Sequence, residues 1–144
     1  MTVRLTGRRG LPRVDRRRLR RRAGAILRSI DRADSELSVV LVDDTTIAQL
    51  NARYRSLPRA TDVLSFSLLE GVHAKRRGEL LGDVVVSLET ADRQARRAGR
   101  SLDDEVLRLL IHGVLHLVGH DHEVASEART MRAEERRIRR IVAP

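Results

Sequence analysis

The hydrophobic and polar positions of this chain follow two periods, which predict a mixture of helices and strands. Apolar residues at every third or fourth position predict amphipathic helices, and short β-branched runs predict strands. The expected helices cover residues 14–30, 44–53, 89–98, 101–118 and 126–142, the expected strands cover 37–42, 62–68 and 80–88, and residues 70–78 form a polar loop. The last strand is apolar on both faces, as expected of a central strand. This order predicts an α/β (α+β) fold, with a small β-sheet covered by helices.

The helix over residues 101–118 has the clearest boundaries. Ser101 is a favourable N-cap residue with Asp104 three positions later, and the acidic first turn suits the positive end of the helix dipole. Gly119 is placed to end the helix in a left-handed conformation. We therefore expect a long helix that stops at residue 118.

Length and composition limit the chain to one domain. The 144 residues suit a single core, and 41% hydrophobic with 34% charged residues is typical of a globular chain. Its longest apolar runs, of four residues, are too short for a membrane-spanning helix. The absence of cysteine excludes a disulfide framework, a thiolate zinc finger and a cysteine nucleophile. We expect one domain over residues 1–144, cytoplasmic and without a membrane partner.

The net charge of +9 is concentrated in the Arg-rich N-terminal segment 1–22. This segment contains ten arginines and one acid, whereas the basic and acidic residues of the remaining chain are equal in number. Such a block suits a polyanion, either nucleic acid or an anionic membrane surface. The alternatives are a solvated helix face or tail, and a transit peptide, which the absence of serine from the segment disfavours.

Four of the five histidines fall within eleven residues: His112, His116, His120 and His122. The first two are four positions apart on the expected helix, so they face the same way, about 6 Å apart along the axis. A helix offers two imidazoles to one metal ion with this spacing. Because Gly119 ends the helix, the chain can turn back so that His122 approaches the same ion. Three imidazoles leave one coordination position open, which is typical of a catalytic zinc site.

Other roles for this cluster stay open. His120 can replace His122 as the third ligand, or add a fourth and close the site to water. Asp121 can orient a ligand imidazole, accept a proton or shape the turn. Without a metal, the histidines would be buried or helix-terminal residues bonded to carbonyl groups. A metalloprotease is disfavoured, because Gly113 stands where HExxH proteases have their glutamate base. Glycine there leaves room for a bulky substrate or for another backbone.

The motif HGVLHLVGHDH at residues 112–122 resembles the HGxLHLxGYDH signature of the YbeY family of metal-dependent, single-strand-specific endoribonucleases. The likeness covers roughly residues 37–138 and includes, in the family's order, Leu50-Asn51, Tyr54-Arg55, TDVLSF at 61–66, LGDVVVS at 81–87, and Met131 with Glu134 or Glu135. The chain departs from the family pattern at three positions, with His120 in place of Tyr, and Ala60 and Ser67 each in place of Pro.

The resemblance implies an α/β fold with a small mixed sheet, and one zinc ion held by His112, His116 and His122 at the end of the long helix. It also implies ribosomal RNA maturation and ribosome quality control, with single-stranded RNA, ribosomal RNA and ribosomal proteins as partners. The family's functional arginine falls on Arg55, whose planar guanidinium suits charge developing on a phosphate. Strand packing and turn formation explain four polar residues at least as well as a position in a cleft does: Thr61, Asp62, Ser65 and Asp83.

Two classes of function fit these motifs. In the first, the chain is a zinc-dependent endoribonuclease in which Arg55 stabilises negative charge, and either water or the RNA 2′-hydroxyl attacks the phosphodiester. In the second, it is a non-catalytic, ribosome-associated RNA-binding factor with a structural zinc. Only two aromatic residues are present, Tyr54 and Phe66. We therefore expect arginines, rather than stacking platforms, to hold the RNA backbone.

Overall fold

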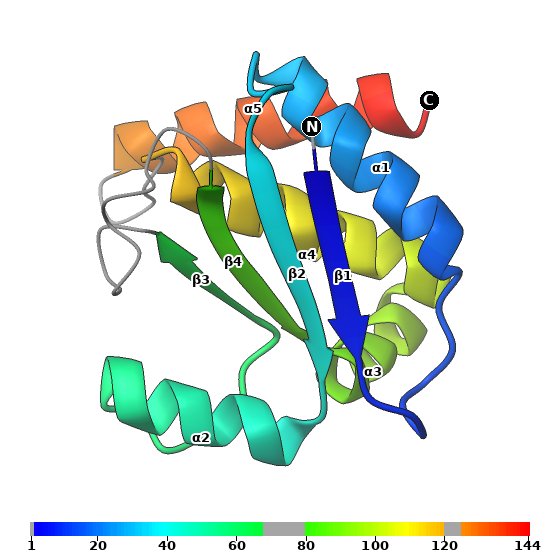
Figure 1. Cartoon of the computed structure of the whole chain (residues 1–144), viewed down its shortest axis with the longest axis vertical. Coiled ribbons are helices and arrows are strands. Elements are labelled where there is room, and N and C mark those ends of the chain that lie inside the picture. The colour runs from blue at the N-terminus through cyan, green and yellow to red at the C-terminus, as the bar shows by residue number, and fades with distance from the viewer. Residues whose placement is uncertain (1, 68–79, 120–124) are drawn as a thin grey trace.

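The computed structural model describes residues 2–67, 80–119 and 125–144 of the chain (Figure 1). The elements in these ranges are β1 (Thr2–Gly7), α1 (Arg16–Ser29), β2 (Glu36–Val42), α2 (Asp44–Arg55), β3 (Val63–Ser67), β4 (Leu80–Ser87), α3 (Leu88–Ala98), α4 (Leu102–Leu117) and α5 (Ala125–Val142). The expected helices and strands are confirmed, with boundaries that differ by at most two residues. The expected loop over residues 70–78 lies outside the described residues.

Strand β1 was not among the expected elements. Its sequence alternates Val3 and Leu5, which pack against the core, with Arg4 and Thr6, which are exposed. Only two apolar residues mark its buried face, so the local signal is weak beside the many arginines that follow. The strand is stabilised by parallel pairing with β2, which the sequence pattern does not reveal.

The sheet is mixed and has the strand order β1-β2-β4-β3. Strand β2 runs parallel to both β1 and β4, whereas β3 is antiparallel to β4. Strand β4 therefore lies inside the sheet, as its apolar run predicted, and Val84 and Val86 are fully buried. Strand β3 forms an edge of the sheet and packs against α4.

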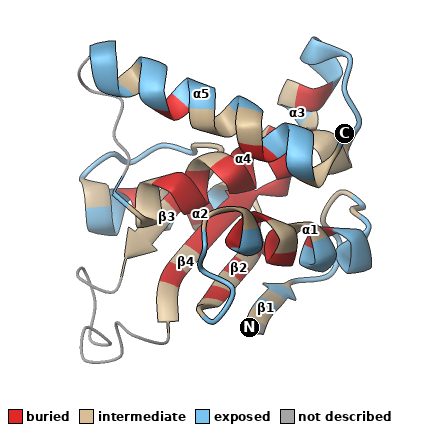
Figure 2. Cartoon of the chain, turned by 90° about the horizontal axis from the view of Figure 1, so that it is seen from above, coloured by how far each residue is buried: buried red, intermediate tan, exposed pale blue. Residues whose placement is uncertain are grey.

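Helices pack on both faces of this sheet. Val39 and Leu41 of β2 belong to the large core that includes α1 and α4. On the other face, Leu64 and Val85 pack with Ile47 of α2. Figure 2 shows α4 lying between the sheet and α5, with most of its residues buried. A helix enclosed on both sides is apolar around most of its circumference, and its position is correspondingly well fixed.

Local hydrogen bonds set the ends of the helices. Ser101 begins α4, and its side chain accepts a hydrogen bond from the backbone N–H of Asp104, as predicted. Asp43 caps α2 in the same way, through the N–H of Thr46. Gly119 follows α4 with a φ of +98°, which confirms the left-handed stop expected there. Within the described residues, none of the helices combines the length and apolarity that crossing a bilayer requires.

The N-terminal arginines contribute in part to the fold. Arg8 lies 2.7 Å from a carboxylate oxygen of Asp43, and Arg22 lies 3.2 Å from one of Asp104. Several others are exposed on or just before α1: Arg9, Arg13, Arg17, Arg20 and Arg21. A solvated helix face thus accounts for part of this block, and a polyanion partner stays a prediction.

Candidate metal centre and cleft

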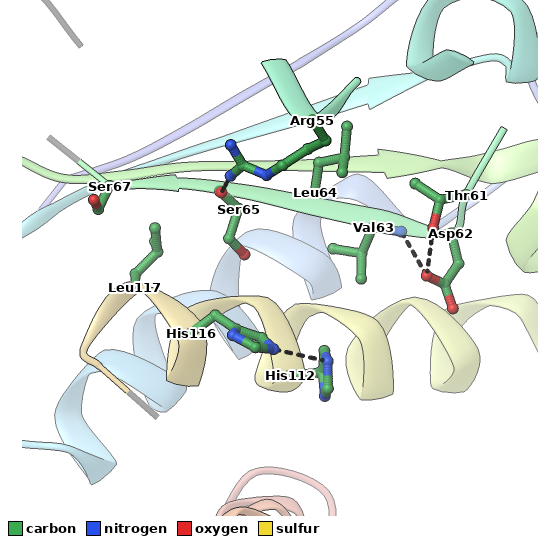
Figure 3. Close-up of a pocket in the computed structure, with 10 residues that line it drawn as sticks. All are labelled: Arg55, Thr61, Asp62, Val63, Leu64, Ser65, Ser67, His112, His116 and Leu117. Atoms are coloured by element: carbon green, nitrogen blue, oxygen red, sulfur yellow. Dashed lines mark hydrogen bonds between the residues drawn. The ribbon is translucent and has the colours of Figure 1, made fainter. Parts of the chain in front are cut away.

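A cavity of about 380 Å³ lies between β3 and the C-terminal half of α4 (Figure 3). Its lining comes from α2, the segment before β3, β3 itself and α4: Arg55, Thr61, Asp62, Val63, Leu64, Ser65, Ser67, His112, His116 and Leu117. The fold therefore brings Arg55, most of the TDVLSF segment and the histidine helix into one cleft, although they are far apart in the sequence.

His112 and His116 are the two predicted ligands that the structure describes, and their rings meet at the cleft. Their Nε2 atoms are 3.2 Å apart (Figure 3). Two nitrogens bound to one tetrahedral zinc, each about 2.0–2.1 Å from the metal, would lie about 3.3 Å apart. The two imidazoles therefore already have the separation that a shared metal ion requires, and their donor atoms fit zinc chemistry.

Glu135 of α5 contacts the other nitrogen of His112. Its Oε1 atom is 3.3 Å from Nδ1 of the imidazole, and this carboxylate is 23% exposed. A carboxylate on Nδ1 leaves Nε2 available as a metal ligand and fixes the orientation of the ring. The family resemblance includes Glu134 or Glu135 but assigns no role to either residue. Glu135 and His112 are 23 positions apart in the sequence, so no local sequence pattern predicts their contact.

The remaining predicted members of the site lie outside the described residues: His120, Asp121 and His122. Among residues 2–67, 80–119 and 125–144, no group of three His, Cys, Asp or Glu side chains is placed to hold a metal. The third ligand, and the choice between His120 and His122, therefore stay predictions.

Gly113 lets the helix approach the sheet closely. A Cβ atom at this position would lie 2.7 Å from Cγ1 of Val84 and 3.1 Å from Oγ of Ser65. Ser65 also donates a hydrogen bond of 2.8 Å to the carbonyl of Gly113. The space beside this glycine is filled by side chains of β3 and β4, rather than by another backbone as one of the two expectations had it. The position is buried and holds no general base.

Arg55 lies at the end of α2 and lines the cleft from the side opposite α4. Its guanidinium donates hydrogen bonds to the carbonyls of Ser65, at 2.8 Å, and Tyr54, at 3.3 Å. It also lies 4.9 Å from the ring centroid of Phe66. These contacts hold a cation in the lining of the cleft that also contains the two imidazoles. Cation–π contact and backbone hydrogen bonds limit the freedom of a side chain that is otherwise long and mobile.

The other polar residues of the cleft have structural contacts. Asp62 accepts hydrogen bonds from the backbone of Val63, at 2.8 Å, and from Gln94, at 3.3 Å. Thr61, Asp62 and Ser65 all line the cavity, whereas Asp83 is not part of its lining. The cleft interpretation thus holds for Thr61, Asp62 and Ser65, and the hydrogen bonds of Asp62 and Ser65 show that these two residues also have structural contacts.

Comparison with known proteins identifies the family. The profile described as "Endoribonuclease YbeY" matches residues 12–142. A protein of that name from Anaeromyxobacter sp. strain Fw109-5 is 48% identical over 97% of this chain and 71% of its own length. One from Anaeromyxobacter dehalogenans is 50% identical over 86% of this chain and 63% of its own length. One from Geobacter sulfurreducens is 41% identical over 96% of this chain and 93% of its own length.

A solved structure has a similar fold. The solution structure of TM1509 from Thermotoga maritima has a TM-score of 0.65 and 25% identity, and the match covers 98% of this chain and 89% of that one. The α/β fold with a small mixed sheet is thus found in both proteins. With the profile and the relatives, the chain belongs to the YbeY family of endoribonucleases. The expected family membership is confirmed.

Proposed function

We propose that this chain is a zinc-dependent endoribonuclease that cleaves single-stranded RNA in the maturation of ribosomal RNA and in ribosome quality control. The observation that carries the proposal is the 3.2 Å separation of the His112 and His116 Nε2 atoms in a cleft that Arg55 also lines. The names of the curated relatives agree with the reaction class. The proposed partners of the protein are ribosomal RNA and ribosomal proteins, and its proposed location is the cytoplasm.

One zinc ion per chain would be held by His112 and His116 together with His122. A bound divalent cation would supply a Lewis acid beside a phosphodiester group. The protein supplies the orientation of the ligands, because α4 is fixed between the sheet and α5 and Glu135 holds one imidazole. An open coordination position distinguishes this site from the structural zinc of the alternative hypothesis, in which His120 completes four ligands.

Arg55 is the residue proposed to contact the substrate phosphate. Its planar guanidinium can donate two parallel hydrogen bonds to phosphate oxygens and stabilise negative charge as it develops there. The contacts with Ser65, Tyr54 and Phe66 orient the group before substrate binds. Preorganisation of this kind reduces the entropy lost on binding.

The attacking group is either water or the 2′-hydroxyl of the RNA. Asp62, a carboxylate of the cleft, already accepts hydrogen bonds on both oxygens, so it is better suited to shaping the turn than to removing a proton. Attack by the 2′-hydroxyl leaves a 2′,3′-cyclic phosphate on the upstream fragment, whereas direct attack by water does not. Analysis of the product ends therefore distinguishes the two reactions.

Cleavage of single-stranded RNA by four proteins tests the proposal: the wild type, His116→Ala, Arg55→Ala and the control Arg53→Ala. Arg53 is an exposed arginine on the same helix as Arg55, and it does not line the cleft. We expect about a 100-fold or greater loss of kcat/KM in the first two variants, with the control close to wild type. Equal cleavage by all four proteins would overturn the assignment.

A further inference from the structure

A second cavity, of about 230 Å³, lies between α4 and α5. We refer to it as the arginine cavity, because four of its six lining residues are arginines: Arg108, Ile111, Arg132, Glu135, Arg136 and Arg139. Four guanidinium groups and one carboxylate give this lining an excess of positive charge. The cavity is open between two helices and contains no aromatic side chain.

Three of these arginines come from one face of α5. Arg132, Arg136 and Arg139 are separated by four and three positions, so their side chains project from the same side of the helix. All three are exposed. Their guanidinium groups form no hydrogen bond or ion pair within the part of the chain that the structure describes. Like charges at this spacing repel one another, so the stability of the helix does not explain the cluster.

Arg108 differs from these three arginines because it already has an acidic partner. Its guanidinium donates hydrogen bonds of 2.6 Å and 3.1 Å to the buried carboxylate of Glu105. This ion pair raises the pKa of Arg108 above its ordinary value, since the guanidinium hydrogen-bonds to a carboxylate. Arg108 thus forms a fixed wall on α4, and the unneutralised charge of the cavity lies on α5.

The arginine cavity adjoins the cleft that holds the two imidazoles. Glu135 lines the arginine cavity and lies 3.3 Å from His112, which lines the cleft. Arg108 precedes His112 by four positions on α4, which is about 6 Å along the helix axis. The contact between Glu135 and His112 therefore stands at the boundary between the two hollows. A chain that leaves the cleft on this side reaches the arginines of α5 next.

We propose that the arginine cavity is a second binding site for phosphodiester groups of the RNA strand, next to the bond that is cleaved. This inference rests on the proposed function and adds a subsite to it. Guanidinium groups match phosphate geometry, and their contacts with the backbone carry no base information. Since the cavity has no aromatic side chain on which bases could stack, it would hold RNA of any sequence through charge alone.

Binding of a 2′-O-methyl RNA strand, measured by fluorescence anisotropy at several salt concentrations, tests this subsite. The strand is examined on a gel after each titration to establish that it is intact. The test protein is Arg132→Gln/Arg136→Gln. The control is Arg96→Gln/Arg97→Gln, which removes the same charge from exposed positions of α3. That helix precedes the N-terminal end of α4, whereas the histidines lie near the C-terminal end.

We expect the test protein to bind the strand roughly 10-fold more weakly at low salt. The slope of log K against log salt is negative, and its magnitude should decrease by about 1.4, the value for two lost contacts with single-stranded phosphates. The control should keep the affinity and slope of the wild type. An equal loss of affinity in the test protein and the control would show a general effect of charge. An unchanged affinity in the test protein would show that RNA does not bind in the arginine cavity. Either result overturns the proposal.

Titrations with two other ligands distinguish RNA from other occupants of the cavity, and the cleavage assay distinguishes the subsite from the nuclease assignment. A parallel titration with inorganic phosphate identifies a site for free anions: a change in phosphate binding without a change in RNA binding would contradict the proposal. Loss of binding to an acidic peptide, with RNA binding retained, would assign the cavity to a protein partner instead. Failure of the wild type to cleave unmodified RNA would reject the nuclease assignment, whereas the binding comparison decides the subsite without any cleavage.

Discussion

His112 has a different partner on each of its ring nitrogens. Nδ1 is 3.3 Å from the carboxylate of Glu135, and Nε2 is 3.2 Å from the neighbouring imidazole of His116. A carboxylate on one nitrogen favours a proton there and leaves the lone pair on the other. The chemistry assigned to the cleft therefore depends on a residue that lies outside its lining.

We predict that Glu135→Gln lowers zinc affinity about 10-fold, because the amide keeps a hydrogen bond to the imidazole but loses the negative charge. Competition with a chromophoric chelator measures this affinity directly. Asp104→Asn, at the opposite end of α4, is the matched control and should bind zinc as the wild type does. Equal affinities in all three proteins would show that Glu135 does not support the metal ligand.

Glu105 is a carboxylate with no exposed surface, and it lies near the start of α4. It accepts hydrogen bonds from Arg100, at 2.8 Å, and from Arg108, at 2.6 Å. Burial by itself raises the pKa of this carboxyl, but the hydrogen bonds and charges of the two arginines outweigh it and lower the pKa below its ordinary value. The ionised form is therefore favoured in the folded state.

Glu105 should consequently stabilise the protein in a pH-dependent way. Its pKa is lower in the folded than in the unfolded state, so its contribution is complete above the unfolded pKa and is lost as the pH falls through the folded one. We predict that Glu105→Gln lowers the free energy of unfolding by about 2 kcal/mol at neutral pH. In urea titrations over acid pH, the difference from wild type should shrink. A constant difference would contradict this role.

At the scale of the elements, the cleft depends on how closely α4 approaches β3 and β4. Gly113 permits that approach, since a Cβ atom there would meet Val84 and Ser65 at 2.7 Å and 3.1 Å. The hydrogen bond from Ser65 to the Gly113 carbonyl joins helix and strand at the same point. Moving the helix outward would also move His112 and His116 relative to Arg55.

We predict that Gly113→Ala lowers the free energy of unfolding by about 1–3 kcal/mol, the usual cost of overpacking a core. Val84→Ala removes the methyl group that the new Cβ would meet. The double variant should therefore be less destabilised than the sum of the two single variants, as measured by urea denaturation. If the two changes in the free energy of unfolding are additive, the new Cβ at position 113 does not contact the side chain of Val84.

The elements with strong local signals were predictable from the sequence. The ends of α4 follow from the Ser101 cap and from Gly119, and both signals act within a few residues. Strand β1 escaped prediction, because its stability comes from pairing with β2 across 34 positions. The pairing of His112 with His116 follows from helical spacing. Arg55 was found only through the family resemblance, since its distance from the histidines is set by packing.

At the scale of the whole molecule, the arginines fall into two groups with different surroundings. Some form ion pairs that join elements, as Arg8 does with Asp43 and Arg22 with Asp104. Others are exposed on α1 and on α5, two helices that pack against each other in Figure 1. These ion pairs contribute no net charge, so the surplus of +9 comes from basic residues outside them, and the arginines exposed on α1 and α5 are available to a polyanion.

Metal-dependent cleavage of single-stranded RNA tests the central claim most directly. The protein is stripped with a chelator, assayed on a fluorescently labelled strand, and assayed again after zinc is restored. We predict that stripping lowers the rate about 100-fold or more and that stoichiometric zinc restores it, whereas His116→Ala stays inactive with zinc present. Full activity in the stripped protein, or wild-type activity in that variant, would contradict a nuclease whose chemistry depends on the two imidazoles of α4.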